Sequence, residues 1–168
     1  MNDGYREILD SIASDSPTPG GGSVAALCLA HAHSLAAMVA RLTVASEKWS
    51  DGHEIANEVI EGSDEAISDS LALADRDADA FDSVMAAYRM PKNDGFRESR
   101  SQAIRDATIG AAIVPLETLV SASELLHMLL EMSRECNSNA LTDLASSAEL
   151  AHTAARMAEM NVRINTDY

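Results

Sequence analysis

The sequence predicts an all-α protein, an irregular bundle of several helices in which residues 1–168 form one domain. Three observations predict this class. Hydrophobic residues make up 46% of the chain but aromatic residues only 4%, so the core must be aliphatic and rich in alanine. Runs of β-branched residues, which favour strands, are almost absent. The apolar residues recur at steps of three and four, which is the period of a helix. A length of 168 residues without internal repeat, low-complexity tract or linker fits one domain.

The N-terminal part of the chain is expected to form a short helix followed by a glycine-rich loop. Tyr5, Ile8, Leu9 and Ile12 make one apolar stripe. Two prolines and three consecutive glycines in residues 14–23 then rule out a continuing helix.

The glycine loop leads into a second helix, which Ser23 can cap. Free N–H groups at such a helix start favour a negative or electron-rich ligand. The spacing is not that of a Walker loop, so a ligand-binding loop and a plain connector both remain open.

The second helix is expected to run to about Val44 and is apolar nearly all round. A helix of this kind lies at the centre of a bundle or at a subunit interface. Its apolar perimeter is too large for a monomer of this size to cover, which predicts a homodimer. His31, His33, Ser34 and Arg41 interrupt the run, so no stretch reaches the 18 or so apolar residues of a membrane span.

A third helix is expected from Asp64 to about Tyr88. Gly52 and Gly62 are expected to act as breakers around a short amphipathic segment before it. Met90-Pro91 ends the helix, because a residue before proline avoids helical backbone angles. Its apolar residues form one expected core-facing stripe: Ile67, Leu71, Ala74, Ala78, Phe81, Met85 and Tyr88.

Four aspartates on this third helix differ in their expected surroundings. Asp75, Asp79 and Asp82 fall on the side opposite the apolar stripe and should be solvated. Asp77 flanks the stripe, where an ionised carboxylate is costly, so its pKa should rise or a partner should be supplied. A carboxyl group with a raised pKa can exchange protons near neutral pH. The alternative, that Asp77 caps a neighbouring helix or pairs with an arginine, remains open.

The remaining chain is also helical in pattern. A fourth helix is expected from about Ile104, and Pro115 should kink or split it. Asn137-Ser138-Asn139 marks a turn. A last helix then carries a narrow stripe made of Leu144, Ala148, Ala151, Ala155, Ala158 and Val162.

The formal net charge of −15 excludes several partners. Nucleic acid and anionic membranes need a basic surface, so neither is expected to bind. The chain contains 27 acidic residues but only two lysines, Lys48 and Lys92. This composition fits a protein adapted to high salt and equally an acidic surface that serves solubility.

Compartment and metal binding follow from a few residues. The acidic N-terminus is unlike a signal peptide, and Cys28 and Cys136 fit two reduced thiols in the cytoplasm. Cys28, His31 and His33 lie close together, but they do not share one helix face and no second ligand pair has the usual spacing. No metal site is therefore expected.

Several sequence blocks, taken in order, carry a resemblance to a known family. They are Ser16-Pro17-Thr18-Pro19-Gly20-Gly21-Gly22-Ser23, Asp75-Arg76-Asp77-Ala78-Asp79-Ala80-Phe81, Val114-Pro115-Leu116, Asn137-Ser138-Asn139-Ala140-Leu141-Thr142-Asp143 and Asn161-Val162-Arg163-Ile164-Asn165. Together they resemble the cyclodeaminase/cyclohydrolase family, which comprises formiminotetrahydrofolate cyclodeaminase domains and methenyltetrahydrofolate cyclohydrolases. The chain departs from the family pattern at Cys136 and Met157, where small residues are usual, and it ends before the family's last helix.

The resemblance implies a homodimeric helical bundle that acts on a one-carbon unit of tetrahydrofolate, with the folate as substrate and no further cofactor. Asp77 aligns with the family's catalytic aspartate. The substrate-binding residues implied are Pro19, Gly20, Gly21, Gly22, Ser23, Arg41, Lys92, Asn137, Asn139 and Asp143. The alternative is a non-catalytic homodimer of the same lineage with a binding or regulatory role.

Overall fold

The computed structural model of the chain describes residues 4–167, which form helices and their connections and contain no strand. Five α-helices follow one another there: α1 (Tyr5–Ile12), α2 (Gly21–Val44), α3 (His53–Arg89), α4 (Arg97–Met132) and α5 (Leu141–Thr166). Short 3₁₀ helices η1 (Glu47–Gly52), η2 (Asp94–Phe96) and η3 (Ser138–Ala140) lie in the connections. The predicted all-α fold is confirmed.

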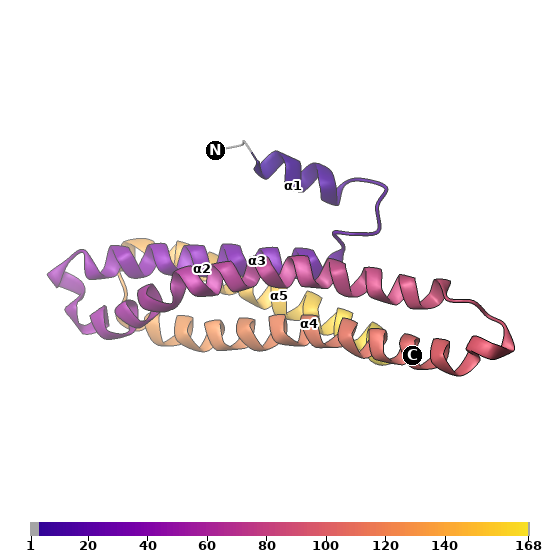
Figure 1. Cartoon of the computed structure of the whole chain (residues 1–168). Helices are drawn as coiled ribbons and strands as arrows, with labels where there is room; N and C mark the ends of the chain where they lie inside the picture. Colours follow the sequence, from indigo (N-terminus) through magenta and orange to yellow (C-terminus); the bar gives the residue numbers. More distant parts are fainter. Residues whose placement is uncertain (1–3, 168) are drawn as a thin grey trace.

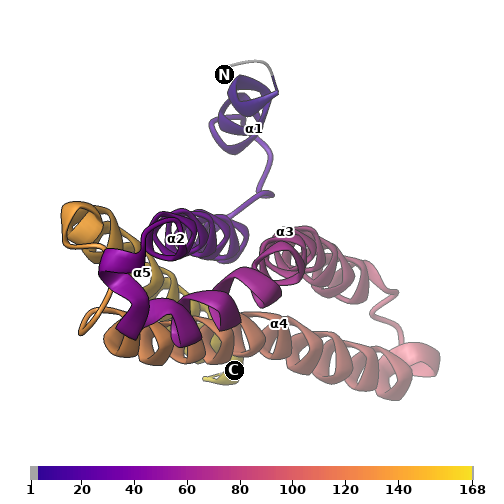
Figure 2. The same ribbon diagram turned by 90° about the vertical axis from the view of Figure 1, so that its left-hand side faces the viewer.

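Helices α2 to α5 form an elongated bundle (Figure 1). Helix α2 packs against α3 and α5, and α4 packs against the same two helices. At one end the hairpin of α3 and α4 extends beyond the start of α2 (Figure 1). Helix α1 stands apart from the bundle at the end of an irregular segment, as Figures 1 and 2 both show.

The core is aliphatic and rich in alanine, as predicted. The larger of two buried clusters places Leu29, Val39 and Leu125 among alanines of α2 and α5. The smaller cluster joins three helices near the start of α2, through Ala26, Leu73, Ala74 and Val114. Alanine side chains are short, so the helix backbones can approach closely at both places.

The predicted break at Gly62 is wrong, because α3 runs unbroken from His53 to Arg89. A glycine inside a helix costs only about 1 kcal/mol. The buried residues Ala56 and Val59, on the turns before Gly62, pack into the larger cluster and hold that segment in place. Gly52 does separate η1 from α3, as expected.

Pro115 does not split α4, which is one helix with this proline inside it. Proline has no N–H, so it leaves the carbonyl group of Ala111, four residues earlier, without its helical donor. The Asn165 side chain of α5 supplies that donor, with Nδ2 lying 2.9 Å from the Ala111 oxygen. Two blocks that are distant in sequence therefore meet in one interaction.

The predicted core stripe of α3 is only partly correct. Of its members Ala74 is buried, whereas Leu71 and Tyr88 are 46% and 48% exposed. The buried face of α3 is rotated from that stripe, and it carries Ser70 and Leu73 beside Ala74. The isolated chain thus leaves an apolar strip of α3 uncovered.

Two segments are long and apolar enough to cross a membrane by length and composition, namely Gly21–Val44 and Asp94–Met132. Over half of the apolar window in the first segment is buried against other helices, which is usual for a core helix of a bundle.

Candidate active site

Asp77 projects from the buried face of α3. It continues the spacing of Ser70, Leu73 and Ala74 by one more turn, and these three residues are buried. Asp77 itself is half-buried, while Asp75, Asp79 and Asp82 are exposed. The predicted division between one enclosed aspartate and three solvated ones is confirmed.

The carboxylate of Asp77 meets the first turn of α2. The Ser23 hydroxyl donates to Oδ2 of Asp77 over 2.9 Å, and the backbone of Ser23 also contributes a hydrogen bond. The prediction that Ser23 caps α2 is wrong, because the N-cap is Gly20, which has no side chain to offer. Asp77 therefore takes the part of a cap from a neighbouring helix, which was the open alternative in the sequence.

The glycines of this turn make the close approach possible. Gly22 is buried, and a Cβ atom at this position would overlap both carboxylate oxygens of Asp77. Gly21 faces α5 instead, where a Cβ would lie 3.7 Å from Nδ2 of Asn161, an ordinary contact. The site thus combines α2, α3 and α5. Asn161 belongs to one of the sequence blocks that carry the family resemblance, but it was not predicted to be a site residue.

The surroundings of Asp77 favour its protonated form. Burial raises the pKa of the Asp77 carboxyl above its usual value, and the hydrogen bonds from the side chain and backbone of Ser23 offset part of that rise. The direction agrees with the sequence prediction. A carboxyl group in this setting can accept a proton from one ligand atom and donate it to another.

An apolar cavity of about 450 Å³ lies between the ends of α3 and α5 and the first half of α4. Asn165 lines this cavity, and its side chain also donates to the backbone oxygen of Asn161. The side chain of Asn161 in turn faces Gly21. Ile113, Leu116 and other apolar side chains form most of the wall. A volume of this size suits a ligand with aromatic rings.

Several predicted substrate-binding residues lie at the other end of α2. About 30 Å of helix separates Gly22 from Thr43, and Arg41, Asn137, Asn139 and Asp143 lie around the Thr43 end or just beyond it. Lys92 is exposed in the connection between α3 and α4, about 20 Å along the helix from Asp77. Of the ten predicted residues, Gly22 and Ser23 lie against Asp77, and Pro19, Gly20 and Gly21 directly precede them in the chain.

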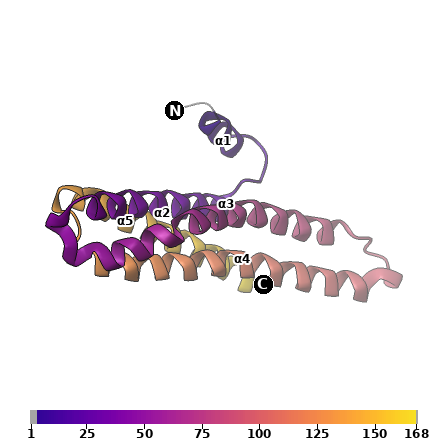
Figure 3. The same cartoon turned by 60° about the vertical axis from the view of Figure 1, so that its left-hand side comes forward.

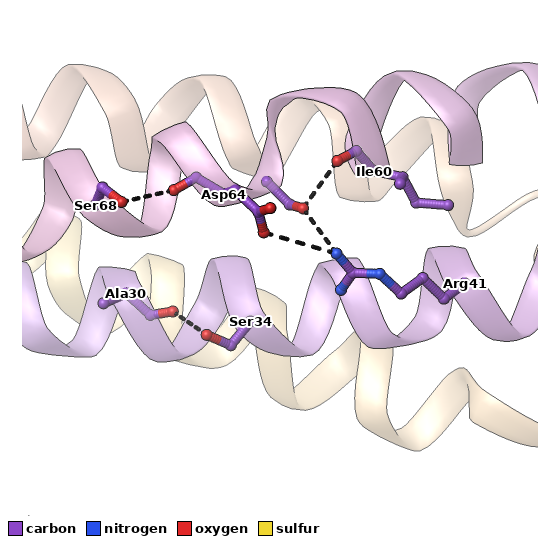
Figure 4. Close-up of polar contacts among 7 residues, drawn as sticks. Ala30, Ser34, Arg41, Ile60, Asp64 and Ser68 are labelled. Carbon is purple, nitrogen blue, oxygen red and sulfur yellow. Dashed lines mark hydrogen bonds and ion pairs between the residues drawn. The ribbon is translucent and has the colours of Figure 1, made fainter.

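Arg41 has partners of its own in the seam between α2 and α3. Its guanidinium donates to the Ser63 hydroxyl over 3.3 Å and lies 3.8 Å from the carboxylate of Asp64 (Figure 4). Ser63 in turn donates to the backbone oxygen of Ile60. The arrangement fixes Arg41 along the seam, away from Asp77.

Asn137 closes the far end of α2. Its Nδ2 atom donates to the Leu42 backbone oxygen, and its backbone N–H donates to the Thr43 hydroxyl, each over 3.1 Å. Its Oδ1 accepts from the backbone N–H of Asn139 and so also holds the turn before α5. The predicted Asn-Ser-Asn turn is confirmed, and its first residue has a structural role.

Comparison with known proteins now gives the family. A family model described as formiminotransferase-cyclodeaminase matches residues 4–168. The chain belongs to this family. It is similar to a methenyltetrahydrofolate cyclohydrolase of Methylorubrum extorquens, with 32% identity over 98% of this chain and 79% of the relative. A formimidoyltransferase-cyclodeaminase of Rattus norvegicus is 31% identical over 95% of this chain, which spans only 30% of that longer protein.

A solved structure in the same family has the same arrangement of helices. The crystal structure of formiminotetrahydrofolate cyclodeaminase from Thermotoga maritima superposes with a TM-score of 0.86 at 31% sequence identity. The similarity covers 96% of this chain and 77% of that one. The resemblance inferred from the sequence blocks is therefore confirmed over nearly the whole chain.

Proposed function

We propose that the chain is an enzyme that acts on the one-carbon unit of a tetrahydrofolate derivative. The observation that carries the proposal is Asp77, a half-buried carboxyl with a raised pKa held between Gly22 and Ser23. Family membership supports the substrate class, because relatives named as cyclohydrolase and cyclodeaminase match the chain over almost its full length.

In the deaminase reaction, the substrate 5-formimino-tetrahydrofolate enters with its formimino group protonated as an amidinium cation, and its para-aminobenzoyl nitrogen attacks the formimino carbon. A new carbon–nitrogen bond forms, and the resulting tetrahedral carbon then releases ammonia to give the methenyl cation. Asp77 accepts the proton of the attacking nitrogen and delivers it to the departing one, so no net proton stays on the protein. The carboxylate also offsets the positive charge of the product.

In the hydrolase reaction, the same carboxylate removes a proton from water, and the water oxygen adds to the methenyl carbon. The carboxyl group then returns that proton to one of the two substrate nitrogens as its carbon–nitrogen bond breaks, the hydroxyl proton passes to solvent, and formyl-tetrahydrofolate leaves. Both reactions need one proton-exchanging group beside a cationic carbon, which Asp77 supplies. We propose that neither a metal nor an organic cofactor is needed, because the substrate nitrogens and one carboxyl carry every step.

We also propose that the enzyme works as a homodimer in the cytoplasm. Apolar side chains on α1, α3 and α4 remain exposed in the single chain, which supports pairing with a second copy. Cys28 and Cys136 are free thiols, as in proteins of a reducing compartment.

The methenyl chromophore tests the proposal directly. We expect absorbance to appear when the protein is mixed with 5-formimino-tetrahydrofolate, or to decay when it is mixed with methenyl-tetrahydrofolate, and a chelator should not change the rate. Folates should also raise the melting temperature, because a native-state ligand stabilises the fold. A melting shift without any chromophore change in either assay would instead support the non-catalytic binding role.

A further inference from the structure

The buried face of α5 ends in a polar side chain at the first turn of α2. Residues on that face recur at three- and four-residue steps, and they are small and fully buried: Ser147, Ala151, Ala154 and Ala158. The next position in this spacing is Asn161, which is half-buried. Figure 3 shows α5 running from the far end of α2 back toward its start. Asn161 on α5 therefore resembles Asp77 on α3, since each follows the core residues of its helix by one turn.

Asn161 and Asp77 flank neighbouring glycines of α2. Gly21 faces Asn161, and Gly22 faces Asp77. Consecutive Cα atoms lie about 3.8 Å apart, so both side chains lie against one short stretch of backbone. One of them is an uncharged amide and the other a carboxyl group. The site thus offers a neutral hydrogen-bonding group beside a group that can exchange protons.

Asn161 keeps part of its hydrogen-bonding capacity free. Its Nδ2 atom donates to the Met157 backbone oxygen over 2.9 Å, and this same atom faces Gly21. Within residues 4–167, no hydrogen bond engages Oδ1 of Asn161. Oδ1 is also not one of the side-chain atoms of that range that are buried without a partner, so a ligand can reach it. An amide oxygen accepts up to two hydrogen bonds.

The end of α5 is anchored, which gives the Asn161 amide a fixed position. The Asn165 side chain donates from Nδ2 to the Ala111 oxygen of α4 over 2.9 Å and to the Asn161 oxygen over 3.0 Å. On the turns before Asn161, Ala154 and Ala158 have no exposed surface. A hydrogen-bonding group held in this way loses little freedom when a substrate binds.

We propose that Asn161 is a substrate-contacting residue, whose Oδ1 atom accepts a hydrogen bond from the reacting one-carbon unit. In the deaminase reaction the donor is an N–H of the amidinium group. In the hydrolase reaction it is the second O–H of the attacking water. Asn161 orients this donor while Asp77 exchanges the proton. The inference rests on the proposed function and adds to it a residue from a third helix.

An amide at position 161 also suits the carboxyl group of Asp77. A second carboxylate there would raise the pKa of Asp77 further, because two negative charges close together disfavour ionisation. Asparagine provides an acceptor without that charge. Asp77 can therefore still lose its proton when the substrate needs a base.

The test compares two substitutions of Asn161 in the methenyl assay across a range of pH and substrate concentration. Asn161→Ala removes the acceptor, so kcat/KM should fall about tenfold or more. Asn161→Asp keeps an acceptor of the same volume but adds a charge. Its kcat/KM should exceed that of Asn161→Ala at high pH, and the acidic limb of its pH–rate profile should move to higher pH.

Ser147→Ala is the matched control on the same face of α5. Ser147 lies about 21 Å from Asn161 along the helix, and its hydroxyl donates to the Ala32 oxygen over 2.7 Å in full burial. Its removal should lower the melting temperature but leave kcat/KM within about twofold and the pH profile unmoved. A purely structural Asn161 would behave in the same way. Unchanged kcat/KM per folded molecule in Asn161→Ala would therefore overturn the proposal.

Two further readouts cover the other outcomes. Where Asn161→Ala folds poorly, Asn161→Asp decides, and an unmoved acidic limb in that variant would overturn the proposal. Where the wild type binds methenyl-tetrahydrofolate without turnover, the melting shift decides. This shift should be smaller in Asn161→Ala than in Ser147→Ala, and equal shifts would refute the contact.

The same measurements separate this inference from the proposed function. An active wild type whose Asn161→Ala variant keeps full kcat/KM would refute the role of Asn161 and leave the folate chemistry standing. A wild type that shows neither a chromophore change nor a melting shift with either folate would refute both.

Discussion

The two ends of α2 are closed by side chains from distant parts of the sequence, but with different chemistry. At the first end, the carboxylate of Asp77 receives hydrogen bonds from Ser23 in partial burial, and its pKa is raised. At the last end, the amide of Asn137 uses both its donor and its acceptor on the backbone of Leu42 and Asn139. One group can still exchange a proton, whereas the other is fully used in holding the fold.

The comparison teaches that similarity of sequence blocks does not by itself separate catalysis from architecture. Both ends carry blocks on which the family resemblance depends. Within the described residues, only the first end places a carboxyl group of raised pKa against a glycine that allows its close approach. Substitutions at each end of α2 test whether function is confined to the first end.

The largest effect is expected for Asp77→Asn. The change keeps the volume but removes the exchangeable proton, so turnover in the methenyl assay should fall about a hundredfold or more. The free energy of unfolding should hold or rise slightly, since an unfavourable buried charge is removed.

The exposed aspartates are the controls for this change. Asp75→Asn, Asp79→Asn and Asp82→Asn should each alter the free energy of unfolding by less than about 0.5 kcal/mol and leave turnover nearly intact. Loss of activity in Asp75→Asn, with activity retained in Asp77→Asn, would show that Asp75 and not Asp77 carries the chemistry.

Two neighbouring glycines sharpen the same comparison. Gly22→Ala places a methyl group against both oxygens of Asp77, so we expect a loss of about 1–3 kcal/mol in stability and at least a tenfold drop in turnover. Gly21→Ala meets Asn161 at an ordinary distance and should leave activity within about twofold. Urea titration and initial rates measure both, and equal losses in the two variants would contradict the packing argument.

Asn137→Ala should affect only stability. It removes the donor to the Leu42 carbonyl and the acceptor for the Asn139 N–H, which should cost about 1–2 kcal/mol in urea titration. The rate per folded molecule should stay unchanged because the site lies about 30 Å away. A selective loss of turnover in a stable Asn137→Ala protein would mean that this end takes part in the function, for example through a partner subunit.

Helical periodicity was sufficient to predict the all-α class, the exposure of Asp79 and the enclosure of Asp77, because each depends on which face of one helix a residue occupies. The continuity of α4 could not be predicted, since it depends on Asn165 of another helix supplying the donor that Pro115 lacks. The capping of α2 by Asp77 likewise joins residues 54 positions apart. The expected stripe of α3 was misplaced in part because apolar periodicity does not distinguish a core from an interface.

The smallest effect expected is a difference in pH dependence between the two ends of α2. Burial raises the pKa of Asp77 in the folded protein above the value of 3.8 for a free side chain, so between these two values the folded state binds more protons than the unfolded state. The contribution of Asp77 to the free energy of unfolding is therefore greatest below the pKa of the unfolded state, and it is lost as pH rises through the pKa of the folded state. Asp77→Asn removes this loss, so the wild type should become less stable relative to that variant as pH rises above 3.8. The stability difference between wild type and Asn137→Ala should stay constant over the same range, because an amide does not titrate. Urea titrations at several pH values give both differences, and a constant wild-type difference for Asp77→Asn would show that Ser23 and the α2 N-terminus compensate the burial fully.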